Sequence, residues 1–391
     1  MKLLIYSRSF APDIGGVETI VRALAQGLEE LRNPQGDHQF DVTVVTESRA
    51  QFEQPDVLFE VVRRPGIAGL YRLIRASDVV HLAGPALLPL FLAKIFRRRV
   101  VIEHHGYQSI CPNGLLLHLP DRSVCPGHFM AGNYRECVRC QSHELSTLGA
   151  IRSLLLMFPR RFLSRSADHN IAITNHVRQR VALPHSSVVY YGISQSDADK
   201  CPASVQPPSK ISFGYLGRFV PEKGIPVLLE ATRQLAGKGF SFDVQLIGDG
   251  PERPRIEETI TRMNLQNFVR LRGFLTGPAL ADALHRIHAV IVPSTWEEAA
   301  GLAAMEPMMR GKAIIASDIG GLGEVVADSG LKFPPGDAEA LAGCMAQVLR
   351  EPARIPRWGE LARSRAQELF ALQRMIAEHA EIYRESLKPR R

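Results

Sequence analysis

Long apolar runs are missing from this sequence of 391 residues. No uninterrupted apolar stretch reaches 18 residues, so we expect no membrane-spanning helix. The opening MKLLIYSRSF holds a short β-rich run followed by polar residues, which does not match a signal peptide. We therefore expect a cytoplasmic protein, or one that attaches to the cytoplasmic face of a membrane without crossing it.

Acidic residues are scarce in the first half, and no signature of nucleic-acid binding is present. Residues 1–195 hold 22 Lys and Arg against 16 Asp and Glu, whereas residues 196–391 hold 25 against 24. The basic excess is concentrated at 96–100 and 151–166. No known nucleic-acid-binding signature accompanies these arginines, which disfavours nucleic acid. The excess fits an ordinary solvated face, or attraction to anionic lipid or to a phosphate-bearing substrate.

Cysteine is rare, but four of the six cysteines crowd into thirty residues. These four are Cys111, Cys125, Cys137 and Cys140. Two of them, Cys137 and Cys140, have the spacing of a zinc knuckle, which the other two can complete to four thiolates. Because the remaining spacings are irregular, the sequence leaves open a structural zinc site, unligated thiols, disulfides or an iron–sulfur cluster.

Strand-like and helix-like patterns alternate from end to end, which indicates an α/β fold. The chain is too long for one ordinary core, so we expect two domains. The predicted strands are 2–7, 40–47, 78–84, 99–106, 169–174, 187–193, 211–217, 242–250, 289–294 and 312–318. Their strand–loop–helix order predicts two Rossmann-like domains with parallel sheets.

The domain boundaries follow from composition. The polar, Pro-rich stretch 194–210 is the expected linker between an N-terminal domain at 1–193 and a second domain at 211–365, followed by a C-terminal helix at 366–391. Residues 107–147 break the α/β rhythm and form a Cys-rich insertion. Two facing sheets would place two ligands in one cleft, which suits group transfer.

Candidate binding residues follow several predicted strands. Gly15 and Gly16 precede a helix, where the backbone can approach a phosphate closely, although a two-glycine turn is often structural. Arg218 and Lys223 follow the first strand of the second half. Together they suit a diphosphate, or they are two exposed cations. Gly248 lies in the glycine turn that ends the strand 242–250.

The stretch STWEEAAGLAAMEPMM at 294–309 places two carboxylates eight positions apart. Glu298 falls in the loop after a strand, and Gly301 marks the start of a helix whose free amides suit phosphate or sugar hydroxyls. Glu306 lies on that helix, where a carboxylate can hold a vicinal diol such as a ribose. A capping Glu and a solvated helical Glu are the alternatives.

Further polar turns follow two other strands. His104 and His105 lie near the end of the stretch 99–106, where the strand runs into a polar turn, and His105, before a glycine, is the better candidate for a donor or base. The glycine turn in 316–326 can cradle phosphate or simply turn the chain.

Taken together, these segments resemble the family 4 retaining glycosyltransferases of the GT-B fold, also called glycosyl transferases group 1. The resemblance covers nearly the whole chain. The matching pieces are FAPDIGGVE, DVVHL, VVIEHHGYQ, FGYLGRFVPEKG, LIGDGPER, VPSTWEEAAGLAAMEPMMRGKAIIASDIGGLGEVV and AEHAEIYRESL. It implies a C-terminal helix that returns to the N-terminal, acceptor domain and a second domain that binds a nucleotide-sugar donor.

The resemblance also implies a role for each candidate residue. Glu298 would lie against the donor sugar, and Glu306 would hold the ribose. Arg218 and Lys223 would neutralise the leaving diphosphate. Further contacts to the donor would come from Gly16, His105 and the amides around Gly301 and Leu302. The leaving diphosphate itself would serve as the base, so that no catalytic metal is required. Asp197–Asp199 matches a metal-binding Asp-x-Asp pattern, but it lies in the linker and is attributed to chance.

The sequence departs from the family pattern at three places. An aromatic residue is replaced by Ala300, which widens the expected sugar pocket, and Pro307 stands inside the predicted helix. The Asn-Gly-Val pattern before the linker is replaced by YYGI at 190–193. None of these changes removes a charged group.

The resulting hypothesis is a hexosyltransferase that uses a UDP-, GDP- or ADP-sugar. Its acceptor would be a glycan or a polyprenyl-diphosphate-linked sugar, as in the biosynthesis of surface polysaccharide or lipopolysaccharide. The alternatives are a sugar-nucleotide epimerase of the same fold, and a basic, zinc-containing binding module with a degenerate transferase body.

Overall fold

The computed structural model describes residues 1–13, 15–49, 57–194 and 210–388. These residues form two compact units. The first unit comprises Met1–Pro120, Cys125–Gly192 and Leu372–Arg391, and the second comprises Asp121–Val124 and Ile193–Ala371. Of the expected linker 194–210 only the two end residues are described, and Asp197–Asp199 lies outside the described residues. None of the helices in the described ranges is long and apolar enough to span a bilayer.

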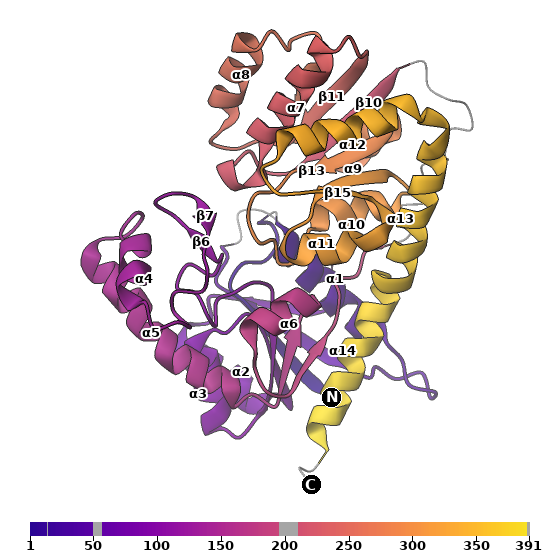
Figure 1. Ribbon diagram of the computed structural model, residues 1–391. Coiled ribbons are helices and arrows are strands. Elements are labelled where there is room, and N and C mark those ends of the chain that lie inside the picture. The colour runs from indigo at the N-terminus through magenta and orange to yellow at the C-terminus, as the bar shows by residue number, and fades with distance from the viewer. Residues whose placement is uncertain (14, 50–56, 195–209, 389–391) are drawn as a thin grey trace. The chain divides into compact units, whose positions relative to one another are not determined.

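The first unit is built on one parallel sheet of seven strands, in the order β3-β2-β1-β4-β5-β8-β9. Figure 1 draws its chain from indigo to magenta, with the C-terminal helix α14 (Leu372–Leu387) in yellow. Its strands are β1 (Lys2–Ser7), β2 (Asp41–Thr46), β3 (Glu60–Arg63), β4 (Val79–Ala83), β5 (Arg99–His104), β8 (His169–Ala172) and β9 (Ser186–Val188). The predicted strands are found, although β9 is shorter than expected and β3 was not predicted. Five of them, β1 to β5, contain two or three adjacent Val, Ile or Leu residues, which is typical of parallel strands covered on both faces.

Helices cover both faces of this sheet. The helices of this unit are α1 (Gly16–Glu30), α2 (Gly66–Ala76), α3 (Leu87–Ile95), α4 (Tyr134–Gln141), α5 (Thr147–Arg165), α6 (Asn175–Val181) and α14 (Leu372–Leu387). Alternate strand residues such as Leu4 and Leu82 pack in one buried cluster with Ile74 of α2 and Leu90 of α3. The C-terminal helix α14 returns to this unit and contacts α1, β4 and β5.

The insertion after β5 contains little regular structure. It holds α4 and two strands of two residues each, β6 (Leu117–His118) and β7 (Ser123–Val124), which form a separate small sheet. The helix α4 packs against α5 through a small cluster that includes Phe129, Cys137 and Met157.

The second unit repeats the same architecture with six parallel strands, in the order β12-β11-β10-β13-β14-β15. Its strands are β10 (Ile211–Leu216), β11 (Phe242–Ile247), β12 (Val269–Gly273), β13 (Ala289–Val292), β14 (Ala313–Ser317) and β15 (Leu331–Phe333). Its α-helices are α7 (Ile225–Gly237), α8 (Arg253–Arg262), α9 (Gly277–Arg286), α10 (Leu302–Met309), α11 (Gly320–Val326), α12 (Ala338–Arg350) and α13 (Ile355–Leu369). Short 3-10 helices are η1 (Pro221–Lys223), η2 (Ala327–Ser329) and η3 (Pro352–Arg354). Pro307 lies inside α10, as predicted.

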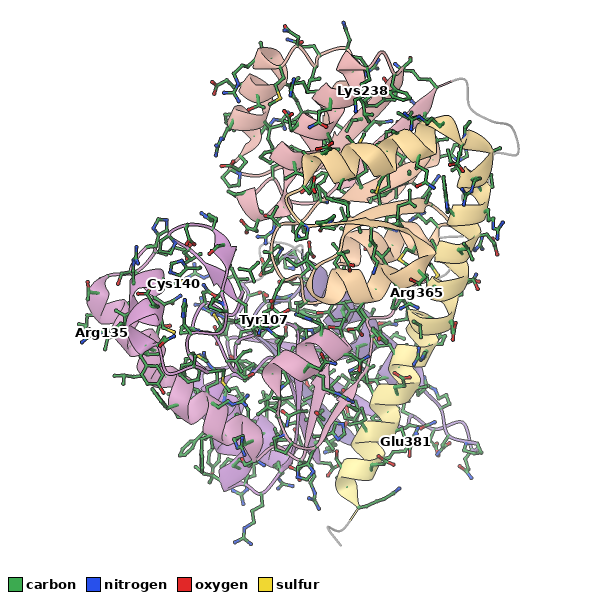
Figure 2. All side chains as sticks on the ribbon, in the orientation of Figure 1. Tyr107, Arg135, Cys140, Lys238, Arg365 and Glu381 are labelled. Atoms are coloured by element: carbon green, nitrogen blue, oxygen red, sulfur yellow. The ribbon has the colours of Figure 1, made fainter. Side chains whose placement is uncertain are left out.

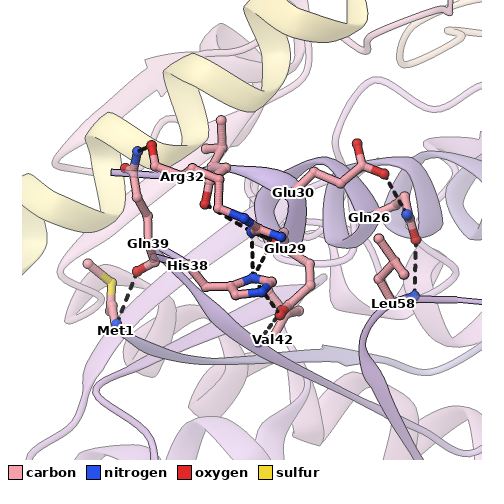
Figure 3. Close-up of polar contacts among 10 residues, drawn as sticks. Met1, Gln26, Glu29, Glu30, Arg32, His38, Gln39, Val42 and Leu58 are labelled. Carbon is pink, nitrogen blue, oxygen red and sulfur yellow. Dashed lines mark hydrogen bonds and ion pairs between the residues drawn. The ribbon is translucent and has the colours of Figure 1, made fainter. Parts of the chain in front are cut away.

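Polar side chains fasten the end of α1 to the start of β2 (Figure 3). The carboxylate of Glu29 accepts a hydrogen bond from the Val42 amide at 2.9 Å and lies 3.2 Å from His38. The amino group of Met1 donates to the carbonyl oxygen of Gln39 at 3.0 Å. These contacts fix the loop that leads into β2 without a disulfide or a metal.

A buried carboxylate, Glu103, lies under α14. Since side chains alternate along a strand, Glu103 of β5 and His81 of β4 project to the face opposite the cluster that holds Leu82. The Glu103 carboxylate lies 3.3 Å from His81 and 3.5 Å from His379 of α14. The hydroxyl of Tyr383, also on α14, lies 2.9 Å from His81 Nδ1. The helix α14 thus supplies polar partners to groups that would otherwise be buried without them.

The charges of this cluster follow from its pKa shifts. Burial opposes ionisation of Glu103, but the neighbouring imidazoles His105 and His379 lower its pKa well below the usual value. Burial also disfavours a charged His379, yet the Glu103 charge and hydrogen bond raise the pKa of His379. For His81 the effect of burial is larger than that of the Glu103 hydrogen bond and charge, so its pKa is lowered. The cluster is therefore a carboxylate paired with the His379 imidazolium beside a neutral His81.

We predict that His379→Gln destabilises the protein in a pH-dependent way. Because the folded-state pKa of His379 is raised, its contribution is fully present below the unfolded-state pKa of about 6.5 and is lost as pH rises through the folded value. Removing one partner of a buried ion pair costs about 3–5 kcal/mol. Urea unfolding of wild type and variant should show that difference at pH 6 and a smaller one at pH 9. The exposed His143→Gln is the matched control, and a pH-independent difference would contradict the assignment.

Candidate functional site

The second unit gathers five strand-end loops at one edge of its sheet. The loop after β10 bonds to the loop after β13 through the Thr295 amide and the Glu222 carbonyl at 2.9 Å. The loop after β13 in turn bonds to α11 through the Glu298 carbonyl, which accepts from the Gly321 amide at 2.7 Å. Such an edge is where open α/β sheets bind ligands. The candidate residues of this unit lie on these loops and on α10.

The best-defined contact at this edge is an ion pair between Lys223 and Glu298. Lys223 Nζ donates to Glu298 Oε1 at 2.7 Å, and the Ser294 hydroxyl donates to the same oxygen. The Glu298 side chain is only 7% exposed. Burial alone would raise the pKa of Glu298, but the charge and hydrogen bond of Lys223 and the bond from Ser294 lower it. Glu298 is therefore an ionised, fixed acceptor, and Lys223 is held in place at the end of η1.

Arg218 lies on the same loop as Lys223, five residues before it. Its side chain is exposed, whereas its carbonyl oxygen accepts a hydrogen bond from the Tyr215 hydroxyl at 2.8 Å. The next residue, Phe219, bonds through its amide to the Asp249 carbonyl at 2.8 Å. The loop is thus fixed by its backbone, while the guanidinium projects into solvent, where it is available to an anion.

Gly248 brings two of these loops into contact. It has φ +139°, and a Cβ there would lie 1.9 Å from the Gly217 carbonyl oxygen. Its amide donates to the Gly273 carbonyl at 2.8 Å. Close backbone packing therefore explains this glycine, which the sequence had suggested as a ligand contact.

Gly301 and Leu302 begin α10, as expected. Gly301 is the N-cap residue in the left-handed region at φ +74°, and Leu302 is the first helical residue. The first amides of a helix have no partner within the helix and favour a negative group. Glu306 lies one turn further along α10 with its side chain exposed. The loop that carries Glu298 thus leads directly into a helix start suited to an anion.

Gly15, Gly16 and His105 belong to the first unit. Gly15 is the N-cap of α1 and Gly16 its first residue. The Glu18 carboxylate lies against Gly15, since a Cβ there would be 2.3 Å from Glu18 Oε2. A phosphate at this helix start would therefore meet a carboxylate, a feature that the glycine pattern did not indicate.

His105 is buried beside the Glu103 cluster. Its Nδ1 lies 2.8 Å from the Tyr191 hydroxyl, and its Nε2 lies 3.6 Å from Glu103 Oε2. Burial lowers the pKa of His105. A neutral imidazole held between a phenol and a carboxylate can donate or accept one hydrogen bond, but its side chain is only 3% exposed. His104 contacts Asn170 instead, at 3.0 Å.

The four clustered cysteines line one small cavity. All four are free thiols in the first unit. Within the described ranges, no three Cys, His, Asp or Glu side chains are already arranged closely enough to hold an ion. The cysteines are thus brought together without forming a finished coordination set.

Comparison with known proteins gives a family match in the second half of the chain. Residues 199–365 match the family described as glycosyl transferases group 1, which is the family that the sequence resembles. The chain is also similar to an alpha-D-kanosaminyltransferase of Streptomyces kanamyceticus, with 28% identity over 173 residues, covering 44% of this chain and 45% of the relative. A glycogen synthase of Mycobacterium tuberculosis is 28% identical over 238 residues, covering 60% and 56%.

The fold is shared with solved structures along nearly the whole chain. Anabaena HepE, solved in complex with UDP and glucose, superposes with a TM-score of 0.70 at 20% identity, covering 97% of this chain and 98% of that chain. The two Rossmann-like units and the similarity to these solved structures identify the GT-B fold, as the sequence resemblance implied. The chain spans about half the length of the two curated relatives described above.

Several residues that shape these sites were missed by the sequence reasoning. Ser294 hydrogen-bonds Glu298, and Glu103 and Tyr191 contact His105. A signal existed for Glu103, because a carboxylate at the end of the buried run VVIEH interrupts an otherwise apolar strand. No local pattern reveals the partnership of Tyr191, which lies 86 residues away from His105.

We predict that Gly248→Ala lowers stability by about 1 kcal/mol or more, because the new methyl group would collide with a backbone oxygen at a φ that disfavours alanine. Gly237→Ala is the matched control. No atom lies within 4 Å of a Cβ at Gly237, in α7, so alanine should leave stability unchanged or raise it by about 0.5–1 kcal/mol. Thermal unfolding of both variants tests this, and equal melting temperatures would refute the packing explanation.

Proposed function

We propose that this protein is a retaining glycosyltransferase that moves a sugar from a nucleotide-sugar to an acceptor hydroxyl. The observation that carries the proposal is the Lys223–Glu298 pair at 2.7 Å, on loops that also carry Arg218 and lead into α10, inside a segment that matches the group 1 family. Positive charge and helix amides stand where a diphosphate leaving group develops charge. Such preorganised electrostatics supply a large part of catalysis in group transfer.

Each residue has a role in this proposal. Arg218 and Lys223 neutralise the leaving diphosphate, and the amides of Gly301 and Leu302 contact the β-phosphate and sugar. Glu298, ionised and fixed, accepts hydrogen bonds from the sugar hydroxyls. Glu306 holds the ribose diol.

The first unit contributes the remaining groups. Gly16 lets the backbone approach the donor phosphates, and His105 acts near the reacting sugar as a neutral imidazole. The diphosphate takes the acceptor proton, so the scheme needs no metal ion.

Transfer is favoured over epimerisation by the names of the relatives, which are a glycosyltransferase and a glycogen synthase. An epimerase would convert the nucleotide-sugar with no acceptor present and without releasing nucleoside diphosphate. A degenerate binding module would do neither. One assay therefore separates all three.

We predict that Arg218→Met abolishes most turnover while leaving the fold intact. A panel of UDP-, GDP- and ADP-sugars, with and without simple glycoside acceptors, is followed by release of nucleoside diphosphate and by NMR of the sugar product. Wild type should release one nucleoside diphosphate class and form an α- or β-linkage that matches the donor. Loss of one preorganised charge costs about 10²–10³-fold in kcat. Because Arg218 is exposed, the melting temperature should not change.

The exposed Arg286→Met on α9 is the matched control and should keep full activity. In the same assay, Glu306→Ala should raise the KM for donor more than it lowers kcat, because a ribose contact is made equally in the ground and transition states. Epimerised donor without nucleotide release, or no turnover with every nucleotide class, would overturn the transferase assignment.

We further propose that the acceptor is lipid-linked and that α5 rests on an anionic membrane surface. The apolar residues of α5 recur at spacings of three and four along one face and are exposed. They are Leu148, Ile151, Leu155, Phe158 and Phe162, with exposures of 78%, 39%, 60%, 45% and 72%. The opposite face packs inward through Ala150, Leu154 and Met157. A solvated apolar stripe of this length is typical of a helix that lies in a membrane interface.

The charge of α5 also favours an anionic membrane surface as the partner. The helix α5 contains four arginines and no acidic residue, and both Arg152 and Arg165 are exposed. The neighbouring α3, which contacts α5, exposes Phe91 and Ile95 at 53% and 55%. Apolar side chains with arginines around them suit anionic headgroups better than a soluble glycan. A polyprenyl-diphosphate acceptor, as used in surface polysaccharide or lipopolysaccharide assembly, would be presented at such a surface.

We predict that the double variant Leu155→Glu, Phe162→Glu loses membrane binding. Wild type should co-sediment with phosphatidylcholine vesicles that contain about a third phosphatidylglycerol, and less so at high salt. Each exposed side chain that enters the interface contributes roughly 1.5 kcal/mol or more, so two charges should weaken binding at least about 10-fold. Turnover of a soluble acceptor should be unaffected.

Leu361→Glu provides the control, since Leu361 is 46% exposed on α13 of the second unit. It should bind vesicles as wild type does. Binding to neutral and anionic vesicles alike, or unchanged binding by the double variant, would rule out α5 as the contact surface.

A further inference from the structure

The insertion 107–147 brings its four cysteines together from three different places in its chain. Cys111 begins a tight turn, closed by the Gly114 amide and the Cys111 carbonyl at 3.0 Å. Cys125 directly follows β7. Cys137 and Cys140 lie one turn apart on α4, where Figure 2 labels Cys140. All four side chains are between 5% and 8% exposed and line the same cavity.

The cavity is lined by residues of polar type as well as by the four cysteines. Buried free cysteines usually pack as small hydrophobic groups, but this cavity is also lined by Asn113, His128, Glu136 and Gln141. The Nδ1 atom of His128 is buried and has no hydrogen-bond partner. Four cysteines gathered around one cavity point to a metal ion, because thiolates are the ligands that zinc and other soft cations prefer.

Hydrogen-bond donors already face one of the sulfur atoms. The Leu119 amide and the Asn113 side-chain amide donate to Cys140 Sγ at 3.4 and 3.6 Å. Donors around a metal-bound thiolate stabilise its negative charge and orient it. The donors at Cys140 Sγ therefore fit a metal-bound thiolate.

The insertion contains little regular structure. Its regular elements are limited to α4 and two strands of two residues each. Apolar residues such as Tyr107, Leu117 and Leu119 are buried, but the cluster around Cys137 holds only Phe129, Cys137, Leu154 and Met157, and two of these belong to α5. Segments with so little regular structure are commonly held by disulfides or by a structural metal, and the cysteines of this insertion are all free.

We propose that Cys111, Cys125, Cys137 and Cys140 bind one zinc ion that fixes the insertion. Four thiolates without an open position match the tetrahedral coordination of structural zinc. Each thiol that becomes a ligand releases its proton to solvent. The Cys111 thiol then gives up its hydrogen bond to Asn113 Oδ1, and the Cys140 thiol gives up its bond to the Leu117 carbonyl. Since no finished coordination set is described, the sulfur atoms turn toward a common point as the ion binds. The site is independent of the proposed transferase activity.

The first experiment measures metal content in the purified full-length chain. Elemental analysis should find about one zinc per chain and no stoichiometric iron. The double variant Cys137→Ser, Cys140→Ser should contain less than about a tenth of the wild-type zinc. Cys344→Ser removes the half-buried thiol of α12 and should keep the full zinc content. Zinc retained by the double variant would overturn the ligand set.

A second experiment needs no variant and remains informative if the double variant fails to fold. Zinc is removed from wild type with a chelator and replaced with Co²⁺. Thiolate-to-cobalt charge-transfer bands and intense tetrahedral d–d bands identify a sulfur-rich site. Limited proteolysis should show cleavage within 107–147 only after chelation, because metal binding couples to local folding.

Three outcomes would overturn the proposal. Iron with acid-labile sulfide indicates a cluster instead. A chain without metal whose four thiols all titrate indicates a thiol core. A chain without metal and with fewer titratable thiols indicates a disulfide.

Discussion

The parallel arrangement of strands is the constraint on which both units depend. In a parallel sheet every strand ends at the same edge, so loops that are far apart in sequence meet there. In the second unit the Gly217 amide bonds to the Ile247 carbonyl at 3.1 Å, and the Gly248 amide bonds to the Gly273 carbonyl at 2.8 Å. Three successive strand ends are thereby joined. The Lys223–Glu298 pair follows from this constraint, because its residues come from loops 75 positions apart.

Each unit buries one ionised carboxylate but surrounds it differently. Glu298 faces a lysine and a hydroxyl, so its charge is fixed over the whole neutral range. Glu103 faces three imidazoles, at 3.3, 3.5 and 3.6 Å. Burial lowers the pKa of His81 and His105 and also opposes a charged His379, but the Glu103 charge raises the pKa of His379. Of these, His379 belongs to α14, the last helix of the chain. The environment of His105 is therefore completed only when the C-terminus has returned to the first unit.

The helix α5 links two of the proposals. Its inward face, through Leu154 and Met157, packs in one cluster with Cys137 of the insertion. Its outward face carries the apolar stripe and the exposed arginines. A metal ion that fixes α4 would therefore also stabilise α5 through the contacts of its inward face. A helix whose apolar face is turned to solvent needs such support, because burial of that face does not hold it in place.

The sequence by itself determined the α/β class, most strand positions and the residues of the donor-side pattern, because these depend on local runs and on motifs with fixed spacing. It also put the four cysteines close together in the chain. Only the tertiary structure decided that Lys223 pairs with Glu298, that Gly248 serves backbone packing, and that Glu18 lies against Gly15. The tertiary structure also places the apolar stripe of α5 at the surface and His379 next to Glu103, and the sequence indicated neither. The reason is physical: burial and charge pairing depend on contacts between distant segments, and a local pattern does not encode its partner.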